Sequence, residues 1–534
     1  MAEHDFTSEL SAASISFSVL KNVKGFPYSS WLAQYSLLST RRDWYKGEPL
    51  EETIDVVQGG KTVKVEKYPL KINLLRGTAK KHASLLIGQG YGSEEVDGQV
   101  IRASVKYKKA QVKETVTEGI GDDGTLTESK EVSLDNELET EAEDAISDVM
   151  EQSYQAAIVT SAAITSQYLG GAGCSLSYDT KDKEITMNYI SGIELFCIPD
   201  GPDMFNLSEA WVVKRITEYQ AIAYGHKPGR NEKDFYYLEH YTKDTYQISV
   251  NGDVIKNDSG VKMEGENVWG FVPIFYIPRI REEVFIGESI ITETAKGLIK
   301  EINLRVADIG DATSSDTHAD IVAGNLKQDP IIRQVGTRSY IDLGSGSALT
   351  GKSDAPFMQV LQTSSSLSAT VSFIQELMTM YRREVNHPSV ADGEDAGSQR
   401  SSLTITTRMF PMIAEVEMQR RFWSAGFSAI AKAILKMANL KGLYGITSKH
   451  LDNPKVSIKW QTMMIRDRQE LVTEAVSRFG SGLSSRVAMN DKLGDVNAEE
   501  EEIEIASEKE ESAKRFAQQS QSEDKSAEKV AENS

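Results

Sequence analysis

The stretch of sequence that decides the fold runs from Ile286 to Ile309 and reads IGESIITETAKGLIKEINLRVADI. Its apolar residues recur at steps of about three or four, which places them on one face of an α-helix. They are Ile286, Ile290, Ile291, Leu298, Ile299, Ile302, Val306 and Ile309. The pattern predicts a helix of about 25 residues, which is roughly 37 Å long.

A second helical pattern of similar length runs from Ser364 to Asn386. Its apolar residues alternate steps of four and three, which is typical of helices that pair along their length. They are Leu367, Val371, Ile374, Met378, Tyr381 and Val385. About 50 residues of strand-like and loop-like sequence separate the two patterns. We therefore predict an antiparallel helix pair that carries a small domain at its far end.

Upstream of this pair, the sequence predicts a mixed α/β region. Asn73 to Ile87 and a longer segment from about Leu138 to Leu169 have helical periodicity, and the Gly/Asp-rich segment Gly119 to Gly124 indicates a hairpin tip or exposed loop. Aromatic and β-branched residues then predict strands at Ser175–Tyr178, Glu184–Tyr189, Glu194–Ile198, Trp211–Tyr219, Phe235–Tyr241 and Tyr246–Val250. This β-rich unit ends near Arg281.

Downstream of the pair, a Gly/Asp/Ser stretch from Ser389 to Gln399 precedes the longest helical pattern of the chain. One face of that helix carries Met409, Ile413, Val416, Trp423, Phe427, Ile430, Ile434 and Met437. Pro411 lies inside it, and we expect a kink there because proline removes a backbone hydrogen bond. Further on, the sequence predicts a strand at Lys455–Trp460, helices at Asp467–Phe479 and Ser484–Leu493, and an acidic carboxy-terminal segment that is disordered from residue 517.

Composition narrows the class of protein. The chain has 534 residues, enough for about three structural units, and 59 basic against 79 acidic residues give a net charge of −20. No apolar run approaches the roughly 18 residues of a membrane span, and the acidic amino terminus does not favour export. Cys174 and Cys197 are predicted to be buried thiols, with a single bridge as the alternative. The acidic balance argues against a surface that grips DNA, but not against one that DNA slides past.

The sharpest single motif is GSALTGKS, from Gly346 to Ser353, which satisfies the phosphate-loop pattern. A strand predicted at Arg338–Leu343 precedes it, as the motif requires. However, Pro356 follows closely and would interrupt the helix that must begin at the end of a phosphate loop. The context favours a Gly/Ser-rich loop, and a P-loop ATPase remains an alternative function.

No other catalytic or metal-binding pattern is present. The seven histidines are scattered, and no zinc-ligand spacing, nucleophile elbow or dinucleotide fingerprint occurs. We therefore expect no catalytic residue, metal or cofactor. Five basic residues are candidates for contact with nucleic acid, but they are more simply explained as surface charges; they are Lys327, Arg333, Arg338, Lys352 and Arg400.

The order of these segments resembles that of the portal proteins of tailed double-stranded DNA bacteriophages. Local similarities support the resemblance: Asn73–Ile87, Gly192–Asp200, Ser398–Ser401 leading into Met409–Met412, Phe479–Ser485 and Leu493–Val496. The resemblance implies an α+β, helix-rich portal fold with these parts: wing 1–285, first stem helix 286–317, clip 318–363, second stem helix 364–387, tunnel loop 388–401, kinked long wing helix and strand 402–465, crown helices 466–516 and disordered acidic tail 517–534.

The same resemblance implies a function without enzymatic activity. Portal proteins form a ring of about twelve subunits at one capsid vertex, through which DNA enters during packaging and leaves at ejection. The expected partners are further copies of the chain, double-stranded DNA, the large terminase, the head-to-tail adaptor, and the major capsid and scaffold proteins, with no membrane. The chain would be a late structural protein of the virion, assembled in the host cytoplasm. A different structural ring or adaptor protein is a second alternative.

Two groups of site residues follow from the resemblance. The DNA-facing tunnel loop would present Asp392, Glu394, Asp395, Ser398, Gln399 and Arg400. Terminase or adaptor contacts in the clip would involve Lys327, Arg333, Arg338 and Lys352. The segment Arg281 to His318 holds 4 basic and 8 acidic residues, so a channel lined partly by it would repel phosphates and let DNA slide.

Overall fold

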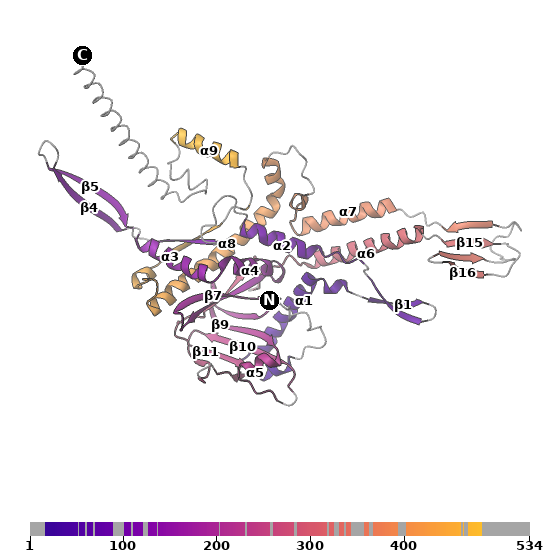
Figure 1. The fold of residues 1–534 in the computed structure, drawn as a ribbon, viewed down its shortest axis with the longest axis horizontal. Coiled ribbons are helices and arrows are strands. Elements are labelled where there is room, and N and C mark those ends of the chain that lie inside the picture. The colour runs from indigo at the N-terminus through magenta and orange to yellow at the C-terminus, as the bar shows by residue number, and fades with distance from the viewer. Residues whose placement is uncertain are drawn as a thin grey trace, which may run out of the picture.

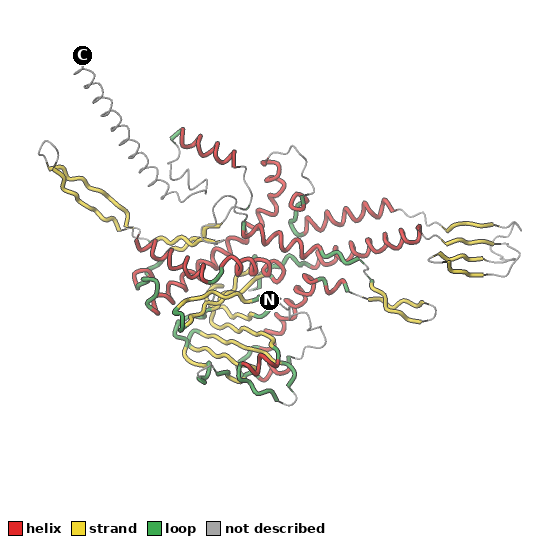
Figure 2. Tube along the Cα trace, in the orientation of Figure 1, coloured by secondary structure: helices red, strands yellow, loops and turns green. Residues whose placement is uncertain are grey.

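The computed structural model has a central α/β body from which a helix pair projects (Figure 1). It describes residues 17–51, 53–58, 61–67, 70–88, 101–107, 111–120, 126–135, 137–201, 203–229, 232–256, 260–281, 286–317, 320–324, 331–335, 338–342, 357–361, 367–393, 402–460, 463 and 468–482. Figure 2 shows how helices and strands are distributed: the strands of the body gather below the helices, and further strands lie at the ends of its extensions. The mixed content fits the predicted α+β class.

The predicted β-rich unit forms two sheets. One has the order β12-β11-β10-β9-β8 with β13 paired to β11, and the other has the order β14-β6-β7. The strands are β6 Gly171–Asp179, β7 Glu184–Ile190, β8 Leu195–Asp200, β9 Asp203–Ile216, β10 Phe235–Thr242, β11 Thr245–Val250, β12 Asp253–Val254, β13 Glu264–Glu266 and β14 Ile274–Pro278. The six predicted strands are all present, so this unit is confirmed.

One of these strands ends earlier than predicted. We expected a strand from Trp211 to Tyr219, but β9 stops at Ile216 and helix α5 begins at Glu218. Thr217 causes the change because its side chain and that of Gln220 form a capping box around the start of α5.

The helix predicted from Leu138 to Leu169 is two helices, α3 Glu137–Gln152 and α4 Gln155–Leu169. Tyr154, at the break, has a φ of 52°, in the left-handed region. Ser153 Oγ accepts a hydrogen bond from the backbone N–H of Met187 in β7, at 2.7 Å. Tertiary bonds to a neighbouring strand therefore hold a break that the helical periodicity did not reveal.

The remaining amino-terminal elements surround this body. They are η1 Ser18–Asn22, α1 Tyr28–Lys46, η2 Glu48–Leu50, β1 Thr53–Gln58, β2 Lys61–Glu66, α2 Leu74–Ile87, β3 Ile101–Lys106, β4 Gln111–Ile120 and β5 Leu126–Asp135. Helix α2 confirms the helix predicted from Asn73 to Ile87. Strands β4 and β5 pair antiparallel around the Gly/Asp-rich segment, which confirms the hairpin predicted there.

The predicted helix pair is present. Helix α6 spans Glu293–Thr317 and α7 spans Leu367–Glu384, and Figure 1 shows them side by side with a small sheet at their outer end. That sheet has the order β16-β17-β15-β18, formed by β15 Asp320–Gly324, β16 Ile331–Val335, β17 Arg338–Asp342 and β18 Phe357–Leu361. Buried apolar side chains join the inner part of the pair to α2: Leu75, Ala79, Ala295, Ile299, Ile302, Leu377, Tyr381 and Val385.

The first helix of the pair begins seven residues later than predicted, at Glu293 instead of Ile286. Ile290 N–H donates to the carbonyl of Gln167 at 3.0 Å, and Ser289 Oγ donates to the carbonyl of Tyr168 at 2.7 Å. These bonds attach the preceding segment to the end of α4 and so remove it from the helix. Thr292 then caps α6, because its Oγ1 accepts from Ala295 N–H at 3.0 Å.

The long carboxy-terminal helix is α8, Ser402–Lys441, with Pro411 inside it. Figure 1 shows that α8 changes direction along its course, in line with the predicted kink. Its buried face includes Val416, Trp423, Phe427, Ile430 and Ile434, which belong to the largest apolar core of the body. The predicted face of this helix is therefore correct.

The last described elements follow α8. They are η4 Ser448–Leu451, β19 Lys455–Trp460, paired with β3, and α9 Arg468–Gly480. The strand has the predicted bounds, and α9 confirms the helix predicted at Asp467–Phe479. The helix predicted at Ser484–Leu493 and the acidic tail lie outside the described residues.

The structure also tests the predictions for the two cysteines and for membrane-spanning segments. Cys174 and Cys197 are both buried and free, which confirms the predicted thiols and excludes a bridge between them. Among the described residues, no helix is both long and apolar enough to cross a bilayer.

Candidate functional site at the end of α7

The candidate site is the point where α7 ends and the chain turns toward α8. The backbone N–H of His387 donates to the carbonyl of Arg382 at 2.8 Å, which closes the last turn of α7, and Pro388 prevents the helix from continuing. A short 3-10 helix, η3, spans Ser389–Asp392, and Gly393 follows with a φ of 77°. The described chain stops at Gly393 and resumes at Ser402.

Asp392 is the centre of a charged cluster at this point. Its carboxylate forms an ion pair with Lys81 of α2, and its Oδ2 lies 3.3 Å from Arg382 Nη2 of α7. His387 Nε2 lies 2.9 Å from Asp392 Oδ1. The side chain of Asp392 is 26% exposed and that of His387 only 4%, so the cluster is partly shielded from water. Three nitrogen groups from two segments therefore surround one carboxylate.

This environment changes the acidity of Asp392. Burial alone would raise the pKa of the carboxyl, but the hydrogen bonds and charges of His387 and Lys81 outweigh it and hold the pKa below the ordinary value of 3.8. Asp392 is therefore ionised at neutral pH, which is the state that its partners require.

Beneath this cluster, α2 and α7 meet in a buried contact. Thr78 and Tyr381 share a hydrogen bond of 3.0 Å between their hydroxyl groups. The rings of His82 and His387 lie with centroids 6.1 Å apart, and His82 is fully buried. Burial, together with the nearby Arg279 and His387, lowers the pKa of His82 well below 6.5, so His82 is neutral.

The other end of α2 is fastened to α8. Arg420 Nε donates to the carbonyl of Leu86 at 3.0 Å, and Arg420 Nη2 donates to the carbonyl of Leu85 at 3.4 Å. These carbonyls belong to the last turn of α2, where no partner exists within the helix and where a cation is favoured. Helix α2 is thus bonded to the helices on both sides of the 394–401 connection.

A buried polar network lies near this junction and joins α8 to the β-rich unit. Arg279, which follows β14, forms an ion pair with Glu415 of α8, and Arg279 Nε donates to Gln167 Oε1 of α4 at 2.8 Å. Gln167 in turn donates to Gln419 at 2.9 Å. Burial lowers the pKa of Arg279 to about 10, so its guanidinium keeps its charge at neutral pH.

The residues predicted for the tunnel loop are only partly described. Asp392 lies in the cluster above, whereas Glu394, Asp395, Ser398, Gln399 and Arg400 lie outside the described residues. For the predicted clip residues, Arg333 lies in β16 and Arg338 in β17, while Lys327 and Lys352 lie outside the described residues. These assignments stay predictions.

Sequence reasoning missed the partners of Asp392. Lys81 is 311 residues away along the chain, and the histidines were interpreted as scattered although His82 and His387 are adjacent in space. The nearest signal in the sequence was the helical periodicity of Asn73–Ile87 and of Ser364–Asn386. Periodicity predicts the faces of two helices, but not which turns of them meet.

The phosphate-loop motif has an unsuitable context. Strand β17 precedes the motif, but the next described element is strand β18, which begins at Phe357. Only three residues separate Ser353 from that strand, too few for the helix that a phosphate loop requires after its Lys-Ser pair. The structure therefore weighs against a P-loop ATPase.

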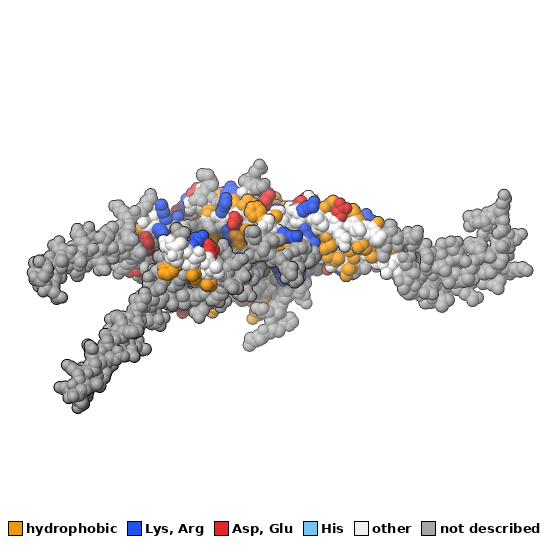
Figure 3. All heavy atoms as spheres, turned by 90° about the horizontal axis from the view of Figure 1, so that it is seen from above, with side chains coloured by type: hydrophobic (Ala, Val, Ile, Leu, Met, Phe, Trp, Pro, Cys, Tyr) orange, Lys and Arg blue, Asp and Glu red, His pale blue; other side chains and the backbone are white. Residues whose placement is uncertain are grey.

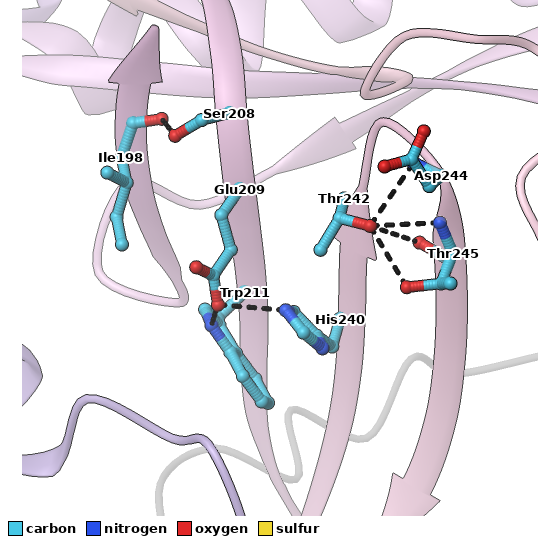
Figure 4. Close-up of polar contacts among 8 residues, drawn as sticks. All are labelled: Ile198, Ser208, Glu209, Trp211, His240, Thr242, Asp244 and Thr245. Atoms are coloured by element: carbon cyan, nitrogen blue, oxygen red, sulfur yellow. Dashed lines mark hydrogen bonds and ion pairs between the residues drawn. The ribbon is translucent and has the colours of Figure 1, made fainter.

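Polar clusters in the β-rich unit brace its strands. Figure 4 shows Glu209 of β9 between Trp211 and His240. Glu209 Oε1 accepts from Trp211 Nε1 at 2.6 Å and lies 2.8 Å from His240 Nε2, and the two rings stack at 3.8 Å. Thr242 closes the β10–β11 turn by accepting from Thr245 N–H at 2.9 Å (Figure 4). The first cluster links β9 to β10, and the second holds the turn between β10 and β11.

A cavity of about 420 Å³ lies beside η1, at the β11–β12 turn. His226 lines it and is bonded to Glu232, with Nε2 3.1 Å from Oε2. Glu232 also accepts from Gly229 N–H at 2.9 Å and from Asn251, so it fixes the surrounding loops. Within the described ranges, no group of three or more His, Cys, Asp or Glu side chains is arranged to hold a metal ion.

Comparison with known families agrees with this architecture. The family described as phage portal protein, SPP1 Gp6-like, matches residues 30–515, which is most of the chain. A search of curated proteins gave no match. The family match includes the helix pair, its outer sheet, the junction at Asp392 and the long helix α8. The chain therefore belongs to the SPP1 Gp6-like family of phage portal proteins.

Proposed function

We propose that this chain forms a ring of about twelve subunits at one vertex of a phage capsid, and that DNA passes through the ring during packaging and ejection. Family membership makes it a portal component of the capsid vertex. The ring number, the assembly in the host cytoplasm and the late expression are part of the proposal. A structural role without catalysis is also part of the proposal.

The observation that carries the proposal is the pair α6–α7 with its outer sheet. The two helices are packed side by side, and the sheet β15–β18 lies at their far end (Figure 1). In the proposed ring, α6 and α7 are the stem helices and the sheet is the clip. The segment 388–401 is the tunnel loop, the body with α8 is the wing, and the helices from residue 466 form the crown.

The surface of the pair supports contacts between subunits. Seen from above, hydrophobic side chains gather over α6 and α7 (Figure 3). On α7, the side chains of Val371, Phe373 and Met380 are 41%, 41% and 44% exposed. Val371 was predicted on the face that pairs with the first helix, and its exposure corrects that prediction. Exposed apolar side chains on a helix are suited to burial against a neighbouring copy.

The charge of the segment around the first stem helix supports a channel through which DNA passes. The segment Arg281 to His318 has an excess of acidic residues, and ionised carboxylates repel phosphates. We propose that the clip docks the large terminase during packaging and the head-to-tail adaptor afterwards, with Lys327, Arg333, Arg338 and Lys352 as contact residues. The body and crown would face the capsid and scaffold proteins.

The test is the shape and mass of the purified full-length protein. Negative-stain microscopy and native mass spectrometry should show a ring of about twelve copies, with an axial channel and a stalk formed by the helix pair. Deletion of residues 318–363, replaced by a short Gly-Ser linker, should shorten the stalk and leave the ring. A particle without an axial channel would contradict the proposal and favour another kind of adaptor.

A further inference from the structure

The position of Asp392 differs from that expected of a residue that faces DNA. Its carboxylate is 26% exposed and is held by Lys81, Arg382 and His387. Lys81 belongs to α2, and Arg382 belongs to the last turns of α7. A carboxylate that is paired with Lys81 and Arg382 has its charge largely offset by these two cations and is poorly suited to repel a passing phosphate.

The same contacts fix the chain at the start of the predicted tunnel loop. The backbone N–H of Ala391 donates to the carbonyl of Pro388 at 2.9 Å, and that of Gly393 donates to Val390 at 3.0 Å. These two bonds form η3, and Asp392 is its last residue. Its side chain thus bonds η3 to α2, and Ala391 of η3 packs on the main apolar core.

Helix α2 also holds the far side of the connection. Arg420 of α8 bonds to the carbonyls of Leu85 and Leu86, one to two turns along α2 from Lys81. The two segments that flank residues 394–401 are therefore attached to one helix of the body. A displacement of η3 relative to α2 therefore moves the start of the connection relative to the body.

We propose that Asp392 is a positioning residue: through Lys81, His387 and Arg382 it clamps η3 to α2 and so sets where residues 394–401 leave the body. Asp392 is then not one of the DNA-facing charges predicted for the loop, which leaves Glu394 and Asp395 as its predicted acidic residues. This inference rests on the proposed function of the loop in the channel. It assigns that function to a shorter segment than 388–401.

The protonation state of Asp392 agrees with a clamp that is closed at neutral pH. A carboxyl with a lowered pKa stabilises the folded state above its ordinary value of 3.8, and this contribution disappears as the pH falls through the lower folded-state pKa. The groups that face it are Lys81 from α2, with Arg382 and His387 from the end of α7.

The test compares two variants of the assembled full-length protein. Asp392→Asn removes the charge of the clamp with little change of shape, and Lys81→Met removes its partner on α2 and keeps an apolar stem. Hydrogen–deuterium exchange of the peptide covering 386–393 should accelerate about 2- to 5-fold in each variant, as expected for the loss of a partly exposed ion pair. The double variant should exchange no faster than the single ones.

A matched control separates the clamp from a general loss of charge. Asp200→Asn breaks an ion pair with Lys243 on the surface of the β-rich unit. This variant should leave the exchange of 386–393 unchanged. If Asp392→Asn also leaves that exchange unchanged, or if the effects of Asp392→Asn and Lys81→Met simply add, the clamp is excluded.

Phage heads that carry the variants test the link to DNA. Asp392→Asn and Lys81→Met should change DNA retention in the same direction, because both release η3. A change with Asp392→Asn but none with Lys81→Met would show that Asp392 acts on DNA directly, and would overturn the inference. Glu394→Gln combined with Asp395→Asn tests the loop itself. Suppose that this double variant and both clamp variants leave DNA retention unchanged, while exchange at 386–393 accelerates in the clamp variants. The clamp then stands, and the loop's role in DNA handling fails.

Discussion

At the scale of single residues, His82 makes the stability of the body depend on pH. It lies on α2, fully buried against His387, with Arg279 nearby. Burial and these neighbours hold its pKa well below 6.5, so the folded protein keeps the imidazole neutral where the unfolded chain would protonate it. A neutral histidine at the junction of α2 and α7 makes the stability of this contact dependent on pH.

The sign of that dependence follows from proton linkage. Below about pH 6.5 the unfolded chain binds a proton at residue 82 that the folded state does not, so stability falls as the pH falls. We expect His82→Leu to reduce the slope of the free energy of unfolding between pH 6.5 and 5.5 by up to about 1.4 kcal/mol per pH unit. Urea unfolding at several pH values measures this slope.

Burial also lowers the pKa of His240, so the unchanged protein and the His82→Leu variant will both lose stability on acidification. The prediction therefore concerns the difference between the pH slopes of the free energy of unfolding of these two proteins. Above pH 7.5 the slopes should coincide, since His82 is then neutral in both states. Parallel curves throughout the range would mean that His82 has the same pKa in the folded protein as in the unfolded chain.

At the scale of elements, the start of α6 depends on a close approach of two backbones. A Cβ added at Gly287 would overlap the carbonyl oxygen of Gly170, at the end of α4. Arg41 of α1 donates to the carbonyl of Leu169 at 2.7 Å and to that of Gly287 at 3.3 Å. This contact attaches the segment before α6 to the body, beside the apolar core that joins α6 and α7 to α2.

Two glycines test this contact. Gly287→Ala should destabilise the protein by about 2 kcal/mol or more, because neither backbone can move without breaking the bonds around it. Gly297→Ala is the matched control: it lies inside α6 with nothing near the added Cβ, and should stabilise the helix by up to about 1 kcal/mol. Thermal unfolding of the unassembled chain measures both. A neutral Gly287→Ala would show that the contact with Gly170 is loose.

At the scale of the whole molecule, net charge opposes the proposed assembly. Each chain carries −20, so a ring of about twelve would carry a formal charge of about −240. Such a ring is stable only if apolar contacts between subunits and bound counterions outweigh the repulsion. The exposed apolar side chains of α7 are available for those contacts.

Ionic strength should therefore favour the ring. Raising NaCl from about 0.1 M to 1 M shortens the screening length from about 10 Å to about 3 Å, which weakens repulsion between chains. We expect the assembled fraction, measured by analytical ultracentrifugation, to rise with NaCl and to respond less to sucrose of equal osmolality. A fraction that falls with salt would indicate that ion pairs across the interface dominate.

The sequence by itself determined the elements that depend on local pattern. The helices α2 and α7, the buried face of α8, the strands of the β-rich unit and β19 follow from periodicities that each segment carries alone. The order of those elements was also enough to indicate a portal, which the family match confirms. Pro411 and the Gly/Asp-rich tip between β4 and β5 were likewise visible, because proline and glycine act on their own backbone.

Only the tertiary structure decided what depends on contacts between distant segments. The break at Tyr154 and the late start of α6 are held by bonds to β7 and α4, which no local pattern encodes. Asp392 is the clearest case: its sequence context suggested an exposed acidic loop, but a lysine 311 residues away holds its carboxylate against α2. The charge of a residue is fixed by its side chain, whereas its partner is fixed by how the helices pack.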